Sequence, residues 1–134
     1  MLGPVLSHEF LAGWRRGRPH WLRRAYAGWL GGLKAAGYEI FLYYFWLDSP
    51  ETSIRRVALR VNAGGHHIPE GTIRQRYAKC VGNFFELYRP LCDEWRVYDN
   101  SDDYTRFVAF GDEDSETVLD PLTWELFERS SGRA

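Results

Sequence analysis

A chain of 134 residues is long enough for one compact domain and too short for two. Its composition, 45% hydrophobic and 26% charged residues, is typical of a globular protein and excludes an intrinsically disordered one. The formal net charge of −1 indicates no class of partner, and no apolar run is long enough to span a membrane. We therefore expect a cytoplasmic protein whose two cysteines, Cys80 and Cys92, are reduced thiols rather than a disulfide or a zinc site.

Charge is distributed unevenly along the chain. Residues 1–24 contain five arginines and one acid, and glycines and prolines interrupt any helical or strand period there. Residues 99–120 contain eight acids and one arginine. An arginine-rich start that binds nucleic acid is an alternative function, but the acidic end offsets its field and no recognition motif accompanies it.

The first predicted elements are a helix and a strand. Apolar residues recur at helical spacing over 26–36, and Gly37 stands where a helix C-cap is expected. Residues 39–47 are almost continuously apolar and aromatic. Such a run predicts a strand that is covered on both faces, as in a parallel sheet.

Two further helices are predicted next. One begins at Pro50, after the capping sequence Asp48-Ser49, and ends near Asn62, where Gly64-Gly65 supply positive dihedral angles. The other begins at Pro69-Glu70, and Pro90 bends or ends it. The apolar stripe of this helix consists of Ile73, Tyr77, Cys80, Val81, Phe84, Phe85 and Tyr88.

The last third of the chain predicts a strand over 95–98, a hairpin and a closing helix. Strand, helical segment and strand in this order indicate a crossover in a parallel sheet. Residues 105–110 and 116–119 flank an acidic turn and predict the hairpin, while Asp120 is expected to cap a helix over 121–128. The predicted fold class is therefore α/β, a parallel sheet followed by a C-terminal β-hairpin and helix.

Arginines surround the Gly-Gly-His-His turn at 64–67. Arg60 precedes the turn, Arg74 and Arg76 follow it on the next helix, and Arg56 shares a face with Arg60. Guanidinium groups on two hinged helices are suited to stabilising charge on a phosphoryl group. The alternative is a solvated helix face with surface ion pairs such as Arg74 with Glu70.

A second candidate site follows the strand at 95–98. Asp99-Asn100-Ser101 would lie at the carboxyl end of a parallel strand, where open α/β sheets bind ligands. The alternative is an Asx turn that leads into the hairpin. His66 and His67 are expected to be turn residues rather than metal ligands, because adjacent side chains diverge and no third ligand is suitably spaced.

From about Tyr26 to Leu119 the chain resembles the C-terminal half of zeta-toxin-like P-loop kinases, relatives of the toxin that phosphorylates UDP-N-acetylglucosamine. The matching stretches, in order, are WLGGLKAAGYEI, FWLDSPETSIRRVALRV, GGHHIPEGTIRQRY, GNFFELYRPLCDEWRVYDNS and FVAFGDEDSETVLD. The resemblance implies that residues 25–134 are the C-terminal half of such a kinase domain, with a helical lid insertion in a partial P-loop-kinase sheet. Residues 1–24 have no counterpart and form an atypical segment.

The resemblance also implies ATP and Mg²⁺ as cofactors and a toxin–antitoxin context. The lid arginines of the family contact phosphates, which points to Arg60 and to Arg74 or Arg76 as catalytic residues. The loop after the last parallel strand lies near the adenine, which points to Asn100 and Ser101.

The phosphate-binding loop of the family is missing from this sequence. GxxxxGK[ST] does not occur, and the lysine, the catalytic base and most sugar-nucleotide contacts belong to an N-terminal half without a counterpart here. We therefore expect a truncated nucleotide-sugar kinase that is inactive alone. The alternative is a non-catalytic binding module: the strand Phe41–Trp46 would expose apolar surface to a second copy or a partner protein, unless residues 1–24 cover it.

Overall fold

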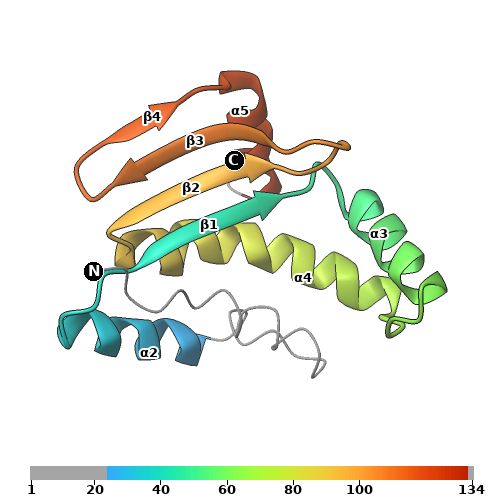
Figure 1. Ribbon diagram of the computed structural model, residues 1–134, viewed down its shortest axis with the longest axis horizontal. Helices are drawn as coiled ribbons and strands as arrows, with labels where there is room; N and C mark the ends of the chain where they lie inside the picture. Colours follow the sequence, from blue (N-terminus) through green and yellow to red (C-terminus); the bar gives the residue numbers. More distant parts are fainter. Residues whose placement is uncertain (1–23, 133–134) are drawn as a thin grey trace.

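The computed structural model describes residues 24–132, which form a four-stranded mixed sheet of order β1-β2-β3-β4 with helices around it (Figure 1). The strands are β1 (Phe41–Trp46), β2 (Glu94–Asp99), β3 (Arg106–Asp112) and β4 (Glu116–Val118). The helices are α2 (Arg24–Ala35), α3 (Pro50–Asn62), α4 (Glu70–Asn83) and α5 (Pro121–Ser130). A π-helical turn over Phe84–Tyr88 and a 3-10 turn over Arg89–Leu91 continue α4 toward β2. The predicted α/β class is confirmed.

The sheet combines one parallel pair with an antiparallel hairpin. β1 and β2 run parallel, in register from Phe41 opposite Glu94 to Trp46 opposite Asp99, and α3 and α4 make the crossover between them. β3 runs antiparallel to β2, with a bulge at Val97/Tyr98, and β4 runs antiparallel to β3. The parallel pair and the hairpin both lie where the sequence pattern predicted them.

Side-chain caps fix where two of the helices begin. The Ser49 hydroxyl accepts a hydrogen bond from the Thr52 amide at 3.2 Å, and Pro50 occupies the first turn of α3. The Asp120 carboxylate accepts one from the Thr123 amide at 3.1 Å at the start of α5. Both predicted caps are confirmed.

The connection between α3 and α4 depends on both of its glycines, for different reasons. Gly64 has a φ of +94°, as predicted for the end of α3. Gly65 does not have a positive φ, so that part of the prediction is wrong. Its amide donates to the Arg60 carbonyl at 2.7 Å, and a Cβ at Gly65 would lie only 2.8 Å from that oxygen. Close approach of the backbone is therefore what requires glycine at position 65.

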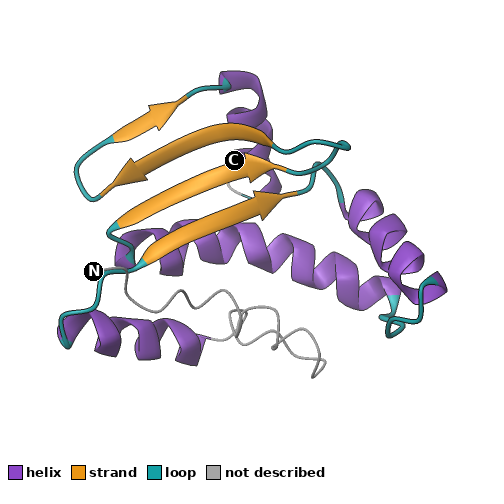
Figure 2. Ribbon diagram, viewed as in Figure 1, coloured by secondary structure: helices purple, strands orange, loops and turns teal. Residues whose placement is uncertain are grey.

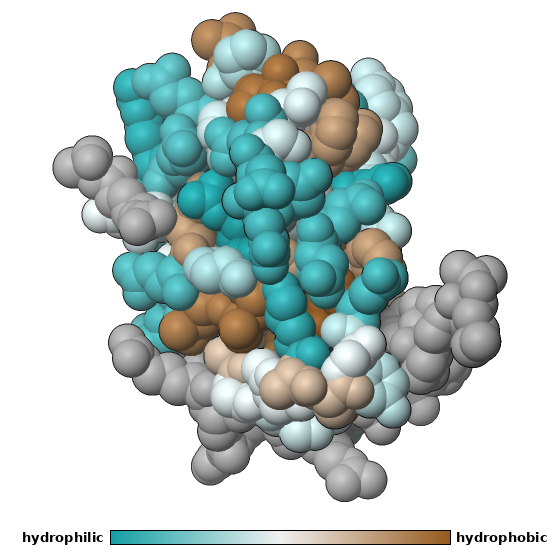
Figure 3. Space-filling view, turned by 90° about the vertical axis from the view of Figure 1, so that its left-hand side faces the viewer, coloured by the Kyte–Doolittle hydropathy of each residue, from teal (hydrophilic) through white to brown (hydrophobic). Residues whose placement is uncertain are grey.

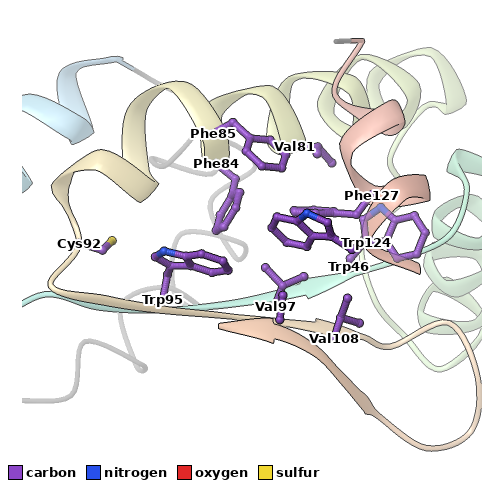
Figure 4. Packing of buried hydrophobic residues seen from close by; sticks show 11 residues of the cluster. Trp46, Val81, Phe84, Phe85, Cys92, Trp95, Val97, Val108, Trp124 and Phe127 are labelled. Carbon is purple, nitrogen blue, oxygen red and sulfur yellow. The ribbon is translucent and has the colours of Figure 1, made fainter. Parts of the chain in front are cut away.

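The core lies between one face of the sheet and the helices α4 and α5 (Figure 2). Aromatic rings dominate it, as Figure 4 shows, and their edges and faces meet at centroid distances of 5 to 6 Å. The cluster consists of Trp46, Val81, Phe84, Phe85, Cys92, Trp95, Val97, Val108, Ala109, Trp124 and Phe127. Many of the aromatic residues of the sequence thus lie in this core and make it unusually bulky.

The opposite face of the sheet is exposed over β1. Phe41, Tyr43 and Phe45 are 53%, 50% and 56% exposed. The prediction that this strand is covered on both faces is therefore wrong. Among the described residues, β1 is an edge strand of the sheet, and the helices α4 and α5 both cover the same face.

Helix α2 is fixed beside the sheet by its buried Leu30 and by a charged cluster. Lys34 lies 2.7 Å from Glu113 in the β3–β4 turn and 3.5 Å from Asp93 before β2. Figure 3 looks onto this end of the molecule, where hydrophilic residues occupy the middle of the face and hydrophobic areas lie above and below them. The C-cap expected after α2 is present, because Gly37 has a φ of +96°.

Candidate functional site at the carboxyl ends of β1 and β2

The two parallel strands end side by side, and the loops that follow them are joined. The Asn100 amide donates to the Trp46 carbonyl at 2.8 Å, and the Asp48 amide donates to the Ser101 hydroxyl at 2.9 Å. Because ligands of open α/β sheets bind beyond the carboxyl ends of parallel strands, this edge is the candidate site. Asn100 and Ser101 directly follow the carboxyl end of β2, the position that the sequence predicted for them.

Asp99 organises the loop after β2. Its side chain is 5% exposed, and its carboxylate accepts a hydrogen bond from the Ser101 amide at 3.0 Å and another from the Ser101 hydroxyl. Arg106 donates to its other oxygen at 2.8 Å, and this bond raises the pKa of the guanidinium. The Asx turn that the sequence left as an alternative is thus present, and it shapes the loop that carries Asn100 and Ser101.

Arg56 connects α3 to the same loop. Its Nη2 donates to the main-chain carbonyls of Asn100, Ser101 (3.1 Å) and Asp102 (3.5 Å). The Asn100 side chain is oriented separately, since its Oδ1 accepts from the Thr105 hydroxyl at 3.0 Å. This role of Arg56 was not predicted from the sequence, because its acceptors lie 44 to 46 residues away along the chain.

The three predicted lid arginines lie in three different surroundings. Arg74 on α4 lies 2.7 Å from Glu51 at the start of α3, and both side chains are largely exposed. Arg60 is exposed in the last turn of α3, one turn beyond Arg56. Arg76 is half-buried, near enough to Cys80 to favour its thiolate. Of the three, Arg74 is linked to the first turn of α3, directly after the loop that follows β1.

The ion pair of Arg74 joins the two helices rather than two turns of one helix. A surface ion pair of Arg74, the alternative to the lid hypothesis, is present, but its partner is Glu51; Glu70, the example that the sequence suggested, contributes only a weaker attraction. The hydrogen bond from Arg74 lowers the pKa of the Glu51 carboxyl, so the pair is ionised at neutral pH. Helix α4 is also held against the end of β1, because the Tyr77 hydroxyl donates a hydrogen bond to the Leu47 carbonyl at 2.7 Å.

The cysteines and histidines offer no reactive centre in the described part of the chain. Cys80 and Cys92 are free, and burial raises the pKa of both thiols, that of Cys92 to about 12. Cys92 donates to the Tyr88 carbonyl at 2.9 Å inside the core. His66 and His67 are exposed in the α3–α4 connection. Within residues 24–132, no group of three or more histidine, cysteine or acidic side chains is arranged to hold a metal ion.

Comparison of the chain with protein-family models, curated proteins and solved structures gave no match. The kinase resemblance therefore stays a prediction that rests on the quoted stretches of sequence. Over residues 24–132, no helix is long and apolar enough to cross a membrane.

Proposed function

We propose that the chain is the carboxyl-terminal part of a zeta-toxin-like kinase domain, and that it binds a nucleoside triphosphate at the ends of β1 and β2 without turnover of its own. One observation carries this proposal. The helix pair α3–α4 stands at the carboxyl ends of two parallel strands, where Arg56 donates to the loop after β2 and Arg74 pairs with Glu51 in the first turn of α3. This is the position from which arginines can contact the phosphates of a ligand at a sheet edge.

The Arg74–Glu51 pair is exposed, and exposed ion pairs stabilise a fold only weakly, so a phosphate can displace Glu51 from Arg74 at little cost. A triphosphate offers Arg74 several charged oxygens in place of one carboxylate, and bidentate contacts to phosphate are stronger. Arg60 lies one turn from Arg56 on the same side of α3 and supplies a second guanidinium. Asn100 and Ser101 supply polar groups for the base.

The missing phosphate-binding loop argues against turnover. Catalysis of phosphoryl transfer requires positioning of both β- and γ-phosphates, which the loop amides and lysine provide in this class of kinase. Mg²⁺ is held by one or two carboxylates together with the substrate phosphates, so binding of Mg²⁺-ATP does not need a preformed cage of acids. The expected activity is therefore binding of ATP, with Mg²⁺ accompanying the phosphates.

Calorimetric titration with Mg²⁺-ATP tests the proposal. Arg74→Ala and Arg60→Ala should each weaken binding about tenfold or more, as expected for loss of a hydrogen bond to a charged group. Glu51→Gln should strengthen binding, because Arg74 is then released from its carboxylate. Arg129→Ala is the matched control, since Arg129 forms a similar exposed pair with Glu125 on α5.

Two results would contradict the proposal. Absence of binding at millimolar Mg²⁺-ATP would refute the proposed nucleotide site. Binding that neither arginine substitution weakens would refute it as well. Steady phosphorylation of UDP-N-acetylglucosamine by the purified chain would show turnover and refute the inactive fragment.

A binding module without any nucleotide is the second candidate function. The exposed aromatic side chains of β1 favour it, because soluble monomers seldom expose large contiguous apolar patches. Loss of association on mutation of that face, together with absence of ATP binding, would select this candidate.

A further inference from the structure

The exposed side of the sheet carries a continuous array of aromatic rings, here named the open face: Phe41, Tyr43, Phe45, Tyr98, Phe107 and Phe110. Rings stack across the strands from Phe45 to Tyr98, at a centroid distance of 5.2 Å, and from Tyr98 to Phe107, at 4.9 Å; along β3, Phe107 stacks on Phe110 at 5.6 Å. The core uses none of these rings. The open face is thus a second apolar layer without a described element on it.

The area of the open face matches the centre of a protein interface. Phe41, Tyr43 and Phe45 are about half exposed and Phe107 is 36% exposed. With about 200 Å² for each ring residue, these four present about 400 Å². That is as large as the largest patch on a typical monomer, and about half of the roughly 800 Å² that each partner buries in a stable complex.

The charges on the open face fit a copy of itself better than a nucleic acid. Arg96 lies over the rings of Tyr43 and Phe107, 5.6 and 5.9 Å from their centroids, and pairs with Glu94 at 2.9 Å. Glu94 stands opposite Asp112 in register at one end of the strands. One cation and two acids do not make the positively charged groove that single-stranded nucleic acids require.

We propose that the open face is a dimer interface, occupied by the open face of a second copy of this chain. Two sheets packed face to face lie about 10 Å apart, with their strands turned by about 30°. Because Arg96 is already paired with Glu94 of its own chain, an apposed copy has to supply no counter-charge. The occupant is a copy because it supplies an aromatic surface of equal area, and a two-fold axis brings the two surfaces together.

This inference does not depend on the nucleotide site. It specifies the partner in the second candidate function, and it is tested without ATP, so that failure of either proposal leaves the other standing.

Sedimentation of the full chain from about 1 to 200 μM, a range that spans micromolar affinity, tests the proposal. A reversible shift from 15.7 kDa to twice that mass is expected. Phe45→Lys should weaken the dimer at least 100-fold, because it places a charge in the centre of the apolar layer. Leu126→Lys is the matched control: Leu126 is 54% exposed on α5 and lies outside the open face, so the dimer should persist.

A charge reversal gives a second test that leaves the aromatic rings in place. Arg96→Glu should weaken the dimer, because Glu94 loses its cation and two unpaired acids are then buried on the open face. Circular dichroism checks that each variant folds. A chain that stays monomeric at all concentrations overturns the proposal, and so does a dimer that Leu126→Lys dissociates while both Phe45→Lys and Arg96→Glu leave it intact.

Discussion

Gly111 shows how closely one residue of β3 is fitted to its surroundings. It is buried beneath the indole of Trp95 and beside the β3–β4 turn. A Cβ at this position would lie 2.5 Å from the Ser115 carbonyl oxygen and 2.6 Å from Trp95 Cζ2. Neither neighbour can retreat easily, since one is main chain and the other is a core ring.

Gly111→Ala should therefore destabilise the fold by about 1–3 kcal/mol, as overpacking does in a dense core. Urea unfolding monitored by tryptophan fluorescence measures the change. Gly32→Ala in α2 is the control: nothing lies within 4 Å of its Cβ, and alanine should raise helix stability by up to about 1 kcal/mol. Equal stability of the two variants would show that the turn moves away from β3.

The conformation and contacts of some residues can be predicted from the sequence, and those of others cannot. The positive φ of Gly64 follows a helical stripe and was predicted from it. Gly111 and Gly65 must be glycine because a Cβ there would collide with atoms that only the folded chain brings close. No local sequence pattern predicts such a collision. The same holds for Arg56, whose acceptors are carbonyls of a loop 44 to 46 residues away.

Among the elements, α5 depends on a cap whose strength should vary with pH. The Asp120 carboxylate accepts hydrogen bonds from the Thr123 hydroxyl and amide, and these bonds lower its pKa. A carboxylate with a lowered folded pKa adds stability above its unfolded pKa of about 3.9. That contribution is lost as pH falls through the folded value.

Asp120→Ala should cost about 0.5–2 kcal/mol at pH 7, the usual range for a lost N-cap. Asp120→Asn should retain most of the capping but lose this part of the pH dependence, because the amide does not titrate. Thermal unfolding from pH 2.5 to 7 measures both effects. An alanine variant as stable as the wild type at pH 7 would show that the cap does not support α5.

Helices and hairpin were predicted better than the surroundings of β1. Caps, glycine stops and apolar stripes are local signals, and they located α3, α4 and α5 within a few residues. The continuous apolar run of β1 predicts a strand, but it cannot say whether both faces are covered. Coverage depends on elements elsewhere in the chain, and both core helices pack on one side.

At the scale of the whole molecule, Phe127 joins the elements into one core. It is fully buried, and its ring lies within about 5.4 Å of the rings of Tyr44, Phe84, Phe85 and Trp124. These residues come from β1, from the π-helical turn that follows α4, and from α5. Removal of this ring should therefore loosen the sheet and the helices together.

Phe127→Ala should lower the free energy of unfolding by about 3–5 kcal/mol, the range for large buried rings. That is a large share of the roughly 5–15 kcal/mol of a typical domain. Leu122→Ala on the same helix is the control, since Leu122 is 77% exposed and should change stability by less than about 0.5 kcal/mol. If the urea unfolding curves of the two variants coincided, Phe127 would not be a central residue of the core.

The parallel pairing of β1 with β2 also sets an order of events during synthesis. Ile40 and Asp93, which hydrogen-bond where the two strands begin, are 53 residues apart in the chain. At about 5–20 residues per second the ribosome needs roughly 3–10 s to make that stretch. For those seconds the aromatic segment Phe41–Trp46 exists without β2, the strand that pairs with it in the described part of the chain.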